Sequence, residues 1–175
     1  MAINTIPERL HSFRVYLDGT NELQGLTDIK LPSFEAIKET MKGAGIAGEY
    51  ESPTIGNFGS QKLTLNGRTL TKNFFGLLKL KSQKLDCRGA LQEYDSAQGK
   101  QVFKQVKVTV QGPCLKADLG KFEQGTAIGN TADIEVMYLK VEFDGQTVIE
   151  FDKLNFIFIV NGEDQLAGIR AALGL

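Results

Sequence analysis

The residues that could carry catalytic or metal chemistry are few and lie far apart in the sequence. The 175 residues include one histidine, His11, and two cysteines, Cys87 and Cys114. A Ser-His-Asp or Cys-His site would have to use His11, and neither cysteine is near it in the sequence. One histidine and two separated cysteines also offer too few soft ligands for a metal site. We therefore expect a protein that is not an enzyme, has no metal or cofactor, and keeps both cysteines as free thiols.

Pairs of neighbouring acidic residues could in principle provide a general acid and a general base. On strands or in loops, however, such acids are usually solvated charges, so no catalytic role is predicted for them. The pairs are Glu35/Glu39, Glu49/Glu51 and Glu93/Asp95.

One glycine motif has the spacing of a nucleotide-binding loop. Gly43, Gly45 and Gly48 satisfy GxGxxG. This motif indicates dinucleotide binding only where a strand precedes it, a helix follows it and an acid lies about 20 residues further on. Here Glu49–Pro53 follows, which cannot continue a long helix, and Arg68 stands near the position of the acid. We interpret the motif as a flexible glycine-rich loop.

Composition and charge exclude several classes of protein. Hydrophobic residues make up 42% of the chain and charged residues 23%, which excludes a disordered chain. Twenty Lys and Arg against 21 Asp and Glu give a net charge of −1, which disfavours a strongly basic nucleic-acid binder. No apolar run approaches the roughly 20 residues of a membrane helix. The length suits a single domain spanning residues 1–175.

Alternating apolar residues indicate β-strands, most of them with one buried face. Phe13, Val15 and Leu17 stand at every second position, and the valines between residues 102 and 110 all fall on even positions. The segment Ile134–Phe143 differs, because its first residues are apolar on both faces. We expect the chain's own core to cover one face of this segment and something else to cover the other.

Turn signals separate the strands, and two short helical patterns interrupt them. Asp144-Gly145 is an expected type I′ hairpin turn, which needs positive φ at both central residues. Ser96–Gly99 is expected to join a second hairpin, and Asp18-Gly19 to close the first strand. About eight or nine antiparallel strands follow. Apolar spacing predicts a helix within Leu70–Leu78, and a second over residues 166–173 with Asp164 in its first turn and Gly174 at its end. Both are expected to be packing helices.

Three segments are expected to lie outside the regular strands. Lys42–Gly59 contains five glycines and Pro53, so we predict a long irregular loop, which in a compact domain is usually functional. Gly112–Gly129 is a second long connection. Residues 1–11 precede the first strand as an N-terminal arm.

The C-terminal segment Val160–Leu175 reads as a strand, an Asn-Gly turn and a short helix ending in Leu-Gly-Leu. This ending closely resembles that of the major tail tube proteins of contractile-tailed phages and of R-type pyocin-like particles. The resemblance runs from about residue 11 to 175. Further matching segments are Val141–Gly145, Ile149–Asp152, Phe13–Gly19, Leu26–Pro32, Asn73–Leu77 and, more loosely, Lys38–Gly48 as the protruding hairpin loop of the family.

This resemblance implies a mainly β (α+β) fold, an antiparallel barrel or sandwich with one flanking helix and a short C-terminal helix. It implies that the protein is located in a virion tail, or in a phage-tail-like particle, and is assembled in the bacterial host cytoplasm. Six copies would form a ring, and stacked rings a tube with a channel for DNA or ions. Implied partners are the sheath outside, the tape measure protein in the lumen, the baseplate hub and the tail terminator. DNA would pass without specific binding.

The expected contacts between subunits combine the glycine loop and the two-faced strand. An alternative function is a monomeric β-sandwich that binds a ligand, although the absence of Trp and the presence of only four Tyr disfavour an aromatic-lined groove. The candidate contact residues are Gly43, Gly45, Gly48, Tyr50, Pro53, Ile134, Val136 and Tyr138.

Overall fold

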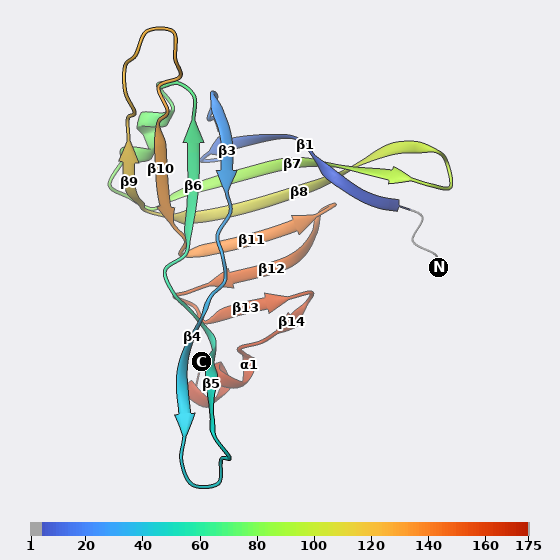
Figure 1. Cartoon of the computed structure of the whole chain (residues 1–175), viewed down its shortest axis with the longest axis vertical. Helices are drawn as coiled ribbons and strands as arrows, with labels where there is room; N and C mark the ends of the chain where they lie inside the picture. Colours follow the sequence, from blue (N-terminus) through green and yellow to red (C-terminus); the bar gives the residue numbers. More distant parts are fainter. Residues whose placement is uncertain (1–4, 175) are drawn as a thin grey trace.

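The computed structural model describes residues 5–174, which form mainly antiparallel β-structure. There is a large sheet in the order β14-β13-β12-β11-β8-β7-β1-β2, a small sheet in the order β3-β6-β10-β9, and a β4-β5 hairpin (Figure 1). The strands of the large sheet are β1 (Thr5–Leu17), β2 (Asn21–Glu22), β7 (Gln83–Asp95), β8 (Lys100–Gly112), β11 (Tyr138–Phe143), β12 (Gln146–Asp152), β13 (Ile157–Val160) and β14 (Glu163–Asp164). The others are β3 (Leu26–Lys30), β6 (Lys62–Gly67), β9 (Cys114–Asp118), β10 (Thr131–Glu135), β4 (Ala36–Lys42) and β5 (Glu49–Phe58).

The hydrophobic core lies between the large and the small sheet, whose strands cross each other in Figure 1. Val15 and Leu17 of β1 are 1% and 5% exposed, which confirms the single buried face expected from the alternation. Leu63 and Leu65 of β6 face them from the small sheet and are fully buried. The arrangement is sandwich-like, and among the described strands neither sheet closes into a barrel, because β14 and β2 remain at opposite ends of the large sheet.

The three predicted turns are confirmed. Asp144 and Gly145 both have positive φ, at 47° and 80°, between β11 and β12. Asp18 and Gly19 behave in the same way after β1, with φ values of 51° and 79°. Between β7 and β8, the Asp95 carboxylate accepts hydrogen bonds from the backbone N–H groups of residues 97 and 98, which fixes the tight turn.

The two helical patterns have different outcomes. The first becomes only a 3₁₀ helix, η1 (Phe74–Leu78), which packs Phe74 and Leu77 into the core. The second is the α-helix α1 (Ala167–Leu173), which ends as predicted at Gly174 in the left-handed conformation, with φ 75°. Within α1 no residue is buried, and the packing expected of this helix comes from its N-cap residue Leu166, which is 4% exposed.

The segment Lys42–Gly59 is a hairpin rather than an irregular loop. β4 and β5 pair from Lys42 opposite Glu49 to Ala36 opposite Phe58, which leaves only residues 43–48 as a loop. A two-stranded ribbon has an open edge on each strand, where a proline and glycines are tolerated. For this reason, the glycines and Pro53 did not prevent strand formation.

The other two irregular segments are also partly strand. β9 takes up residues 114–118 of the second long connection, so the irregular part starts only at residue 119. In the expected N-terminal arm, residues 5–11 belong to β1, and residues 1–4 lie outside the described part. Together with the short strands β2, β13 and β14, these segments explain why the described chain has more strands than expected.

The segment Ile134–Phe143 is two strands in two different sheets. β10 ends at Glu135 and β11 begins at Tyr138. Ile134 and Val136 are fully buried, and after the crossover the buried position moves to Leu139, which is 2% exposed. The segment is apolar at successive positions because the chain crosses from the small to the large sheet at residue 137, and the core-facing positions change from even to odd numbers there. The expectation that something outside the chain covers a second face of one strand is wrong.

Candidate functional site: the assembly surfaces

The chain exposes much more surface than a compact monomer of its size. Its accessible surface is 11317 Å², whereas a compact monomer of 19.2 kDa exposes about 8,400 Å². The excess of about one third comes from elements that project beyond the two packed sheets. In Figure 1 these are the β4–β5 hairpin, the ends of β1, β7 and β8, and the loop between β9 and β10.

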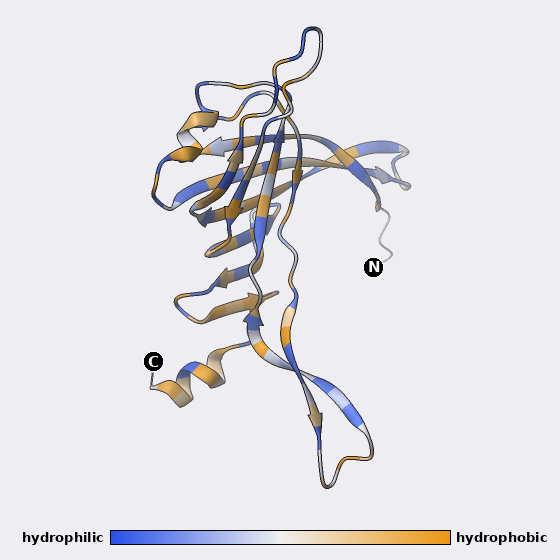
Figure 2. Cartoon of the chain, turned by 60° about the vertical axis from the view of Figure 1, so that its left-hand side comes forward, coloured by the Kyte–Doolittle hydropathy of each residue, from blue (hydrophilic) through white to orange (hydrophobic). Residues whose placement is uncertain are grey.

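Large apolar side chains are exposed on these projections. Exposed apolar side chains that gather on projecting elements are typical of surfaces that other proteins cover. Figure 2 shows apolar positions along the hairpin and on α1. The exposed side chains include Ile37, Met41, Ile46 and Tyr50 on the hairpin, Ile6, Leu10 and Phe103 on β1 and β8, and Leu119 and Phe122 on the loop.

The β4–β5 hairpin contains five of the residues expected in subunit contacts. Gly43, Gly45 and Gly48 form its tip with φ values of 150°, 91° and 114°, so their role is conformational. An added Cβ would meet no other atom at any of the three. Tyr50 and Pro53 follow in β5, and the Tyr50 side chain is 53% exposed. The structure thus brings these five residues together on one projecting ribbon.

The other three expected contact residues lie elsewhere. Ile134 and Val136 belong to the chain's own core, so their side chains are not available to a neighbour, and placing them at a subunit contact was wrong. Tyr138 lies on β11 of the large sheet and donates a hydrogen bond to Glu150 at 2.9 Å. Burial, reinforced by this bond, raises the pKa of Tyr138 to about 12.

An aromatic cluster fixes the root of the hairpin to the large sheet. Phe58 at the end of β5 packs edge-to-face on Phe34, Phe151 and Phe158, with ring centroids 5.1 to 5.5 Å apart. Such pairs add to the free energy of burial through their preferred geometry. The cluster therefore sets the direction in which the hairpin leaves the body of the subunit.

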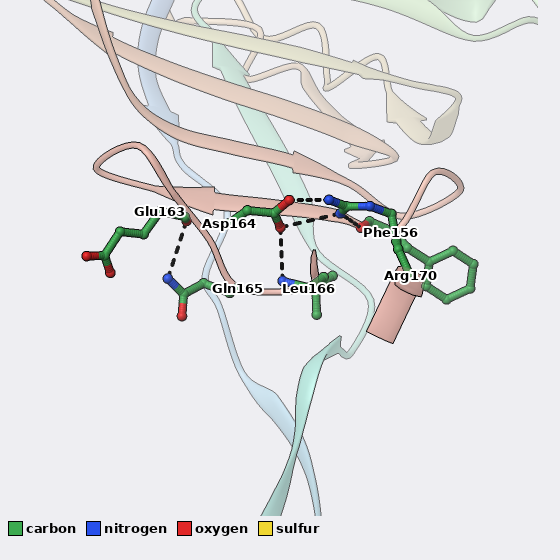
Figure 3. Close-up of polar contacts among 6 residues, drawn as sticks. All are labelled: Phe156, Glu163, Asp164, Gln165, Leu166 and Arg170. Atoms are coloured by element: carbon green, nitrogen blue, oxygen red, sulfur yellow. Dashed lines mark hydrogen bonds and ion pairs between the residues drawn. The ribbon is translucent and has the colours of Figure 1, made fainter. Parts of the chain in front are cut away.

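The segment after β13 forms a clamp on the same root (Figure 3). Leu166, which is 4% exposed, packs against Gly56 of β5. Gly56 has φ 73°, and a Cβ there would lie 2.3 Å from a methyl carbon of Leu166. Only glycine satisfies both the conformation and the space at this position.

Polar contacts hold the clamp in place. Asp164 forms an ion pair with Arg170 and accepts a hydrogen bond from the backbone N–H of Leu166 at 3.0 Å. Arg170 also donates to the carbonyl oxygen of Phe156 at 2.8 Å, as Figure 3 shows. The hydrogen bond from Arg170 is the largest of the effects that lower the pKa of Asp164. A network of this kind ties α1 to the turn between β12 and β13.

A cavity lies between the hairpin root and the clamp. It has a volume of ≈ 450 Å³, and Ile169 of α1 is among its lining residues. Its lining is mainly apolar, with the polar side chains of Thr54 and Asn57 on β5 and of Asp152 and Lys153 at the end of β12. The main lining residues are Ile55, Phe58, Phe151, Phe156, Leu166 and Ile169, with Asp152 and Lys153 beside them.

One edge of the large sheet is open over most of its length. β1 pairs with β7 from Thr5 to Leu17, with irregularities at Glu8 and His11, but β2 covers its other side only at Tyr16 and Leu17. The strand from Thr5 to Arg14 therefore presents backbone N–H and C=O groups at a sheet edge, which is a template for pairing with another chain.

Charges on the described part of the chain are mixed rather than clustered. Lys107 and Lys140 both pair with Glu142, at 3.5 and 3.1 Å. The hydrogen bond from Lys140 is the main reason that the pKa of Glu142 lies below its usual value. Arg88 lies over the ring of Tyr16, with 4.8 Å between the guanidinium carbon and the ring centroid. On this part of the large sheet, cationic side chains are therefore paired with acidic or aromatic neighbours.

The sequence positions considered for chemistry do not form a site. The His11 ring packs against Phe103, with the centroids 5.4 Å apart. Cys87 is buried and Cys114 half-buried, and both are free thiols in the structure. Within residues 5–174, no three His, Cys, Asp or Glu side chains come together as a metal site would require. The same part of the chain has no helix that could span a membrane.

Three comparisons relate this chain to known proteins. The family described as phage tail tube protein FII matches residues 7–174. The chain is 26% identical to the major tail tube protein of Serratia phage KSP20, over 97% of this chain and 98% of that protein. It is 24% identical to the tail tube protein of Escherichia phage P2, over 97% and 99% of the two chains.

A solved structure shares the fold. It is a chain from the cryo-electron microscopy structure of the sheath/tube terminator of an extracellular contractile injection system, PVC, in its extended state. The TM-score is 0.55 at 11% identity, over 78% of this chain and 96% of that one. With the family match over nearly the whole chain, it follows that this chain belongs to the phage tail tube protein FII family, as a structural component of a tail tube and not an enzyme.

Proposed function

We propose that six copies of the chain form a ring and that rings stack into a hollow tube with a central channel. The observation that carries this proposal is the surface of 11317 Å², about one third above that of a compact monomer. A subunit of this shape gains stability when neighbours cover its projecting elements, because burying apolar surface contributes about 25 cal/mol per Å².

Two kinds of contact would build the tube. The open edge of β1, from Thr5 to Arg14, is suited to backbone pairing with a neighbour in the same ring. The β4–β5 hairpin is suited to reach a subunit of the next ring, since it leaves the body along the longest axis (Figure 1). Heterologous contacts that close by rotation give rings, and those that do not close give filaments.

The channel would let DNA or ions pass without binding them tightly. The ion pairs of Lys107 and Lys140 with Glu142 support this part of the proposal, because tight phosphate binding needs clustered unpaired cations. The sheath would surround the tube, the tape measure protein would fill its lumen, and the baseplate hub and tail terminator would occupy its ends.

A shortened hairpin tests the role of β4–β5 in assembly. Glu39 and Ser52 face each other in the ribbon, so residues 40–51 can be replaced by an Asn-Gly turn that leaves Gly56 and Phe58 in place. We expect this variant to keep its circular dichroism spectrum and thermal stability, because the removed residues lie outside the core. Electron microscopy should then show tubes for the wild type and none for the variant.

Two results would contradict the proposal. Normal tubes from the shortened chain would remove the hairpin from the assembly mechanism. A wild-type chain that sediments as a monomer at every concentration, and that is missing from the tube of the native particle, would favour the monomeric ligand-binding sandwich instead.

A further inference from the structure

Phe122 is an exposed aromatic ring on an ordered loop. Its side chain is 89% exposed, on the loop between β9 and β10. The backbone N–H of Lys121 donates to the carbonyl oxygen of Ile128 at 3.0 Å, and that of Thr126 donates to the carbonyl of Glu123 at 3.3 Å. These bonds hold the loop in a defined shape with Phe122 pointing away from the core.

Gly120 makes this shape specific. Its φ is 77°, and a Cβ at this position would lie 2.2 Å from the carbonyl oxygen of Ile128. The two arms of the loop therefore approach each other as closely as glycine permits. A loop built in this way presents the ring of Phe122 as a preformed knob rather than as part of a disordered segment.

The cavity beside the clamp lies toward the other end of the molecule. Figures 1 and 2 both show the β9–β10 loop at one end of the longest axis, and the hairpin and α1 toward the opposite end. The cavity of ≈ 450 Å³ is lined by Phe58, Phe151 and Phe156, with Ile55 and Ile169 beside them. A knob at one end and a matching hole toward the other form a heterologous pair that repeats without closing.

The chemistry of the two surfaces is complementary. An aromatic knob suits an aromatic lining, because edge-to-face ring pairs are favourable beyond their buried area. The polar lining of the cavity includes both Asp152 and Lys153, so the aromatic and aliphatic residues, and not a charge pair, would hold the ring.

We propose that Phe122 of one copy inserts into the cavity between Gly56–Phe58 and α1 of the next copy along the tube. This contact rests on the proposed stacking of rings and identifies one of its surfaces. In this arrangement the hairpin of the receiving copy extends beyond its own cavity toward the copy that supplies Phe122. The hairpin therefore runs along the flank of that copy.

The first experiment separates stacking from ring formation. Phe122→Ser should still form rings by sedimentation, but it should need at least a tenfold higher protein concentration to give tubes in electron micrographs. Leu80→Ser is the matched control, since Leu80 is also fully exposed but lies beside η1 and not on the loop. The control should form tubes at the wild-type concentration.

The second experiment tests the contact directly. In a Cys114→Ser background, a chain with Phe122→Cys is mixed with a chain with Ile169→Cys, assembled and oxidised. We expect disulfide-linked dimers of one chain of each kind, and none when either variant assembles alone. Cys87 is buried and does not compete.

The outcomes separate the contact from the proposed tube. If Phe122→Ser forms tubes at the wild-type concentration, or if mixed tubes give no cross-link, the contact is wrong and the proposed tube stands. If the wild-type chain forms neither rings nor tubes under any condition, the proposed assembly fails and the contact fails with it.

Discussion

Replacing Gly56 by alanine tests whether the clamp holds the root of the hairpin. The new Cβ would lie 2.3 Å from Cδ2 and 2.9 Å from Cδ1 of Leu166, and the backbone would keep its positive φ of 73°. Two separate costs follow. One is the conformational cost of an L-residue at positive φ, and the other is the displacement of Leu166 from its site.

The size of each cost can be worked out from the structure. A non-glycine residue in the left-handed region costs about 1–2 kcal/mol. If Leu166 stays, the overpacking costs about 1–3 kcal/mol, and if it leaves, the loss of its burial costs about 1.5–3 kcal/mol. The total is the cost of the positive φ plus the smaller of these two costs, so Gly56→Ala should lower the free energy of unfolding by about 3 kcal/mol.

Urea unfolding of the isolated chain measures this change, with trypsin cleavage after Arg170 as a local readout of the clamp. Gly59→Ala is the matched control, because Gly59 ends the same segment, lacks a positive φ and has no atom near its Cβ position. It should change stability by less than about 0.5 kcal/mol. In a Leu166→Ala background, Gly56→Ala should cost only its conformational part, about 1–2 kcal/mol. An equal cost with and without the Leu166 side chain would refute the overlap as the cause.

Three further predictions concern titration, thiol reactivity and DNA. Burial alone would raise the pKa of Glu135, but hydrogen bonds from Ser60 and Lys153 outweigh it and lower the pKa. The stability that Glu135 contributes should therefore be present above its pKa in the unfolded chain and lost as the pH falls through its pKa in the folded chain. The free energy of unfolding of Glu135→Gln should accordingly change less with pH than that of the wild type below about pH 5. Burial raises the pKa of Cys87 to about 12, so a maleimide should label Cys114 first and Cys87 only on unfolding, as intact mass spectra will show. A mobility-shift assay at physiological salt should find no tight complex with duplex DNA. A sub-micromolar complex with a steep salt dependence would contradict the proposal that DNA passes through the channel without tight binding.

Local signals in the sequence predicted the parts of the fold that depend on neighbouring residues. The alternation at Val15 and Leu17 identified the buried face of β1, and Asp144-Gly145 identified a turn, because each pattern needs only local geometry. The end of α1 at Gly174 is of the same kind. The sheet order, which places β1 beside β7 and β8 beside β11, depends on contacts between distant segments and was not predictable in this way.

The site was harder to predict because its residues meet only in the folded chain. Gly56 looked like one of several loop glycines, and its requirement for Leu166, 110 positions later, has no local signal. The error at Ile134 and Val136 has a related cause. An apolar pattern with two faces can mean two partners or a strand that changes sheets, and only the crossover at residue 137 decides between them.

The aromatic cluster and the clamp have a consequence for how a tube subunit associates. Binding costs free energy when loops and side chains must be ordered at the interface, and preorganised elements reduce this cost. A two-stranded hairpin alone is marginally stable in water. Here Phe58, held among three other phenylalanine rings, and Gly56, held under Leu166, orient the root of the hairpin within a single chain. In the proposed tube, a neighbour would have only the outer part of the ribbon, beyond Pro53, left to order, and the direction of growth would be set before two subunits meet.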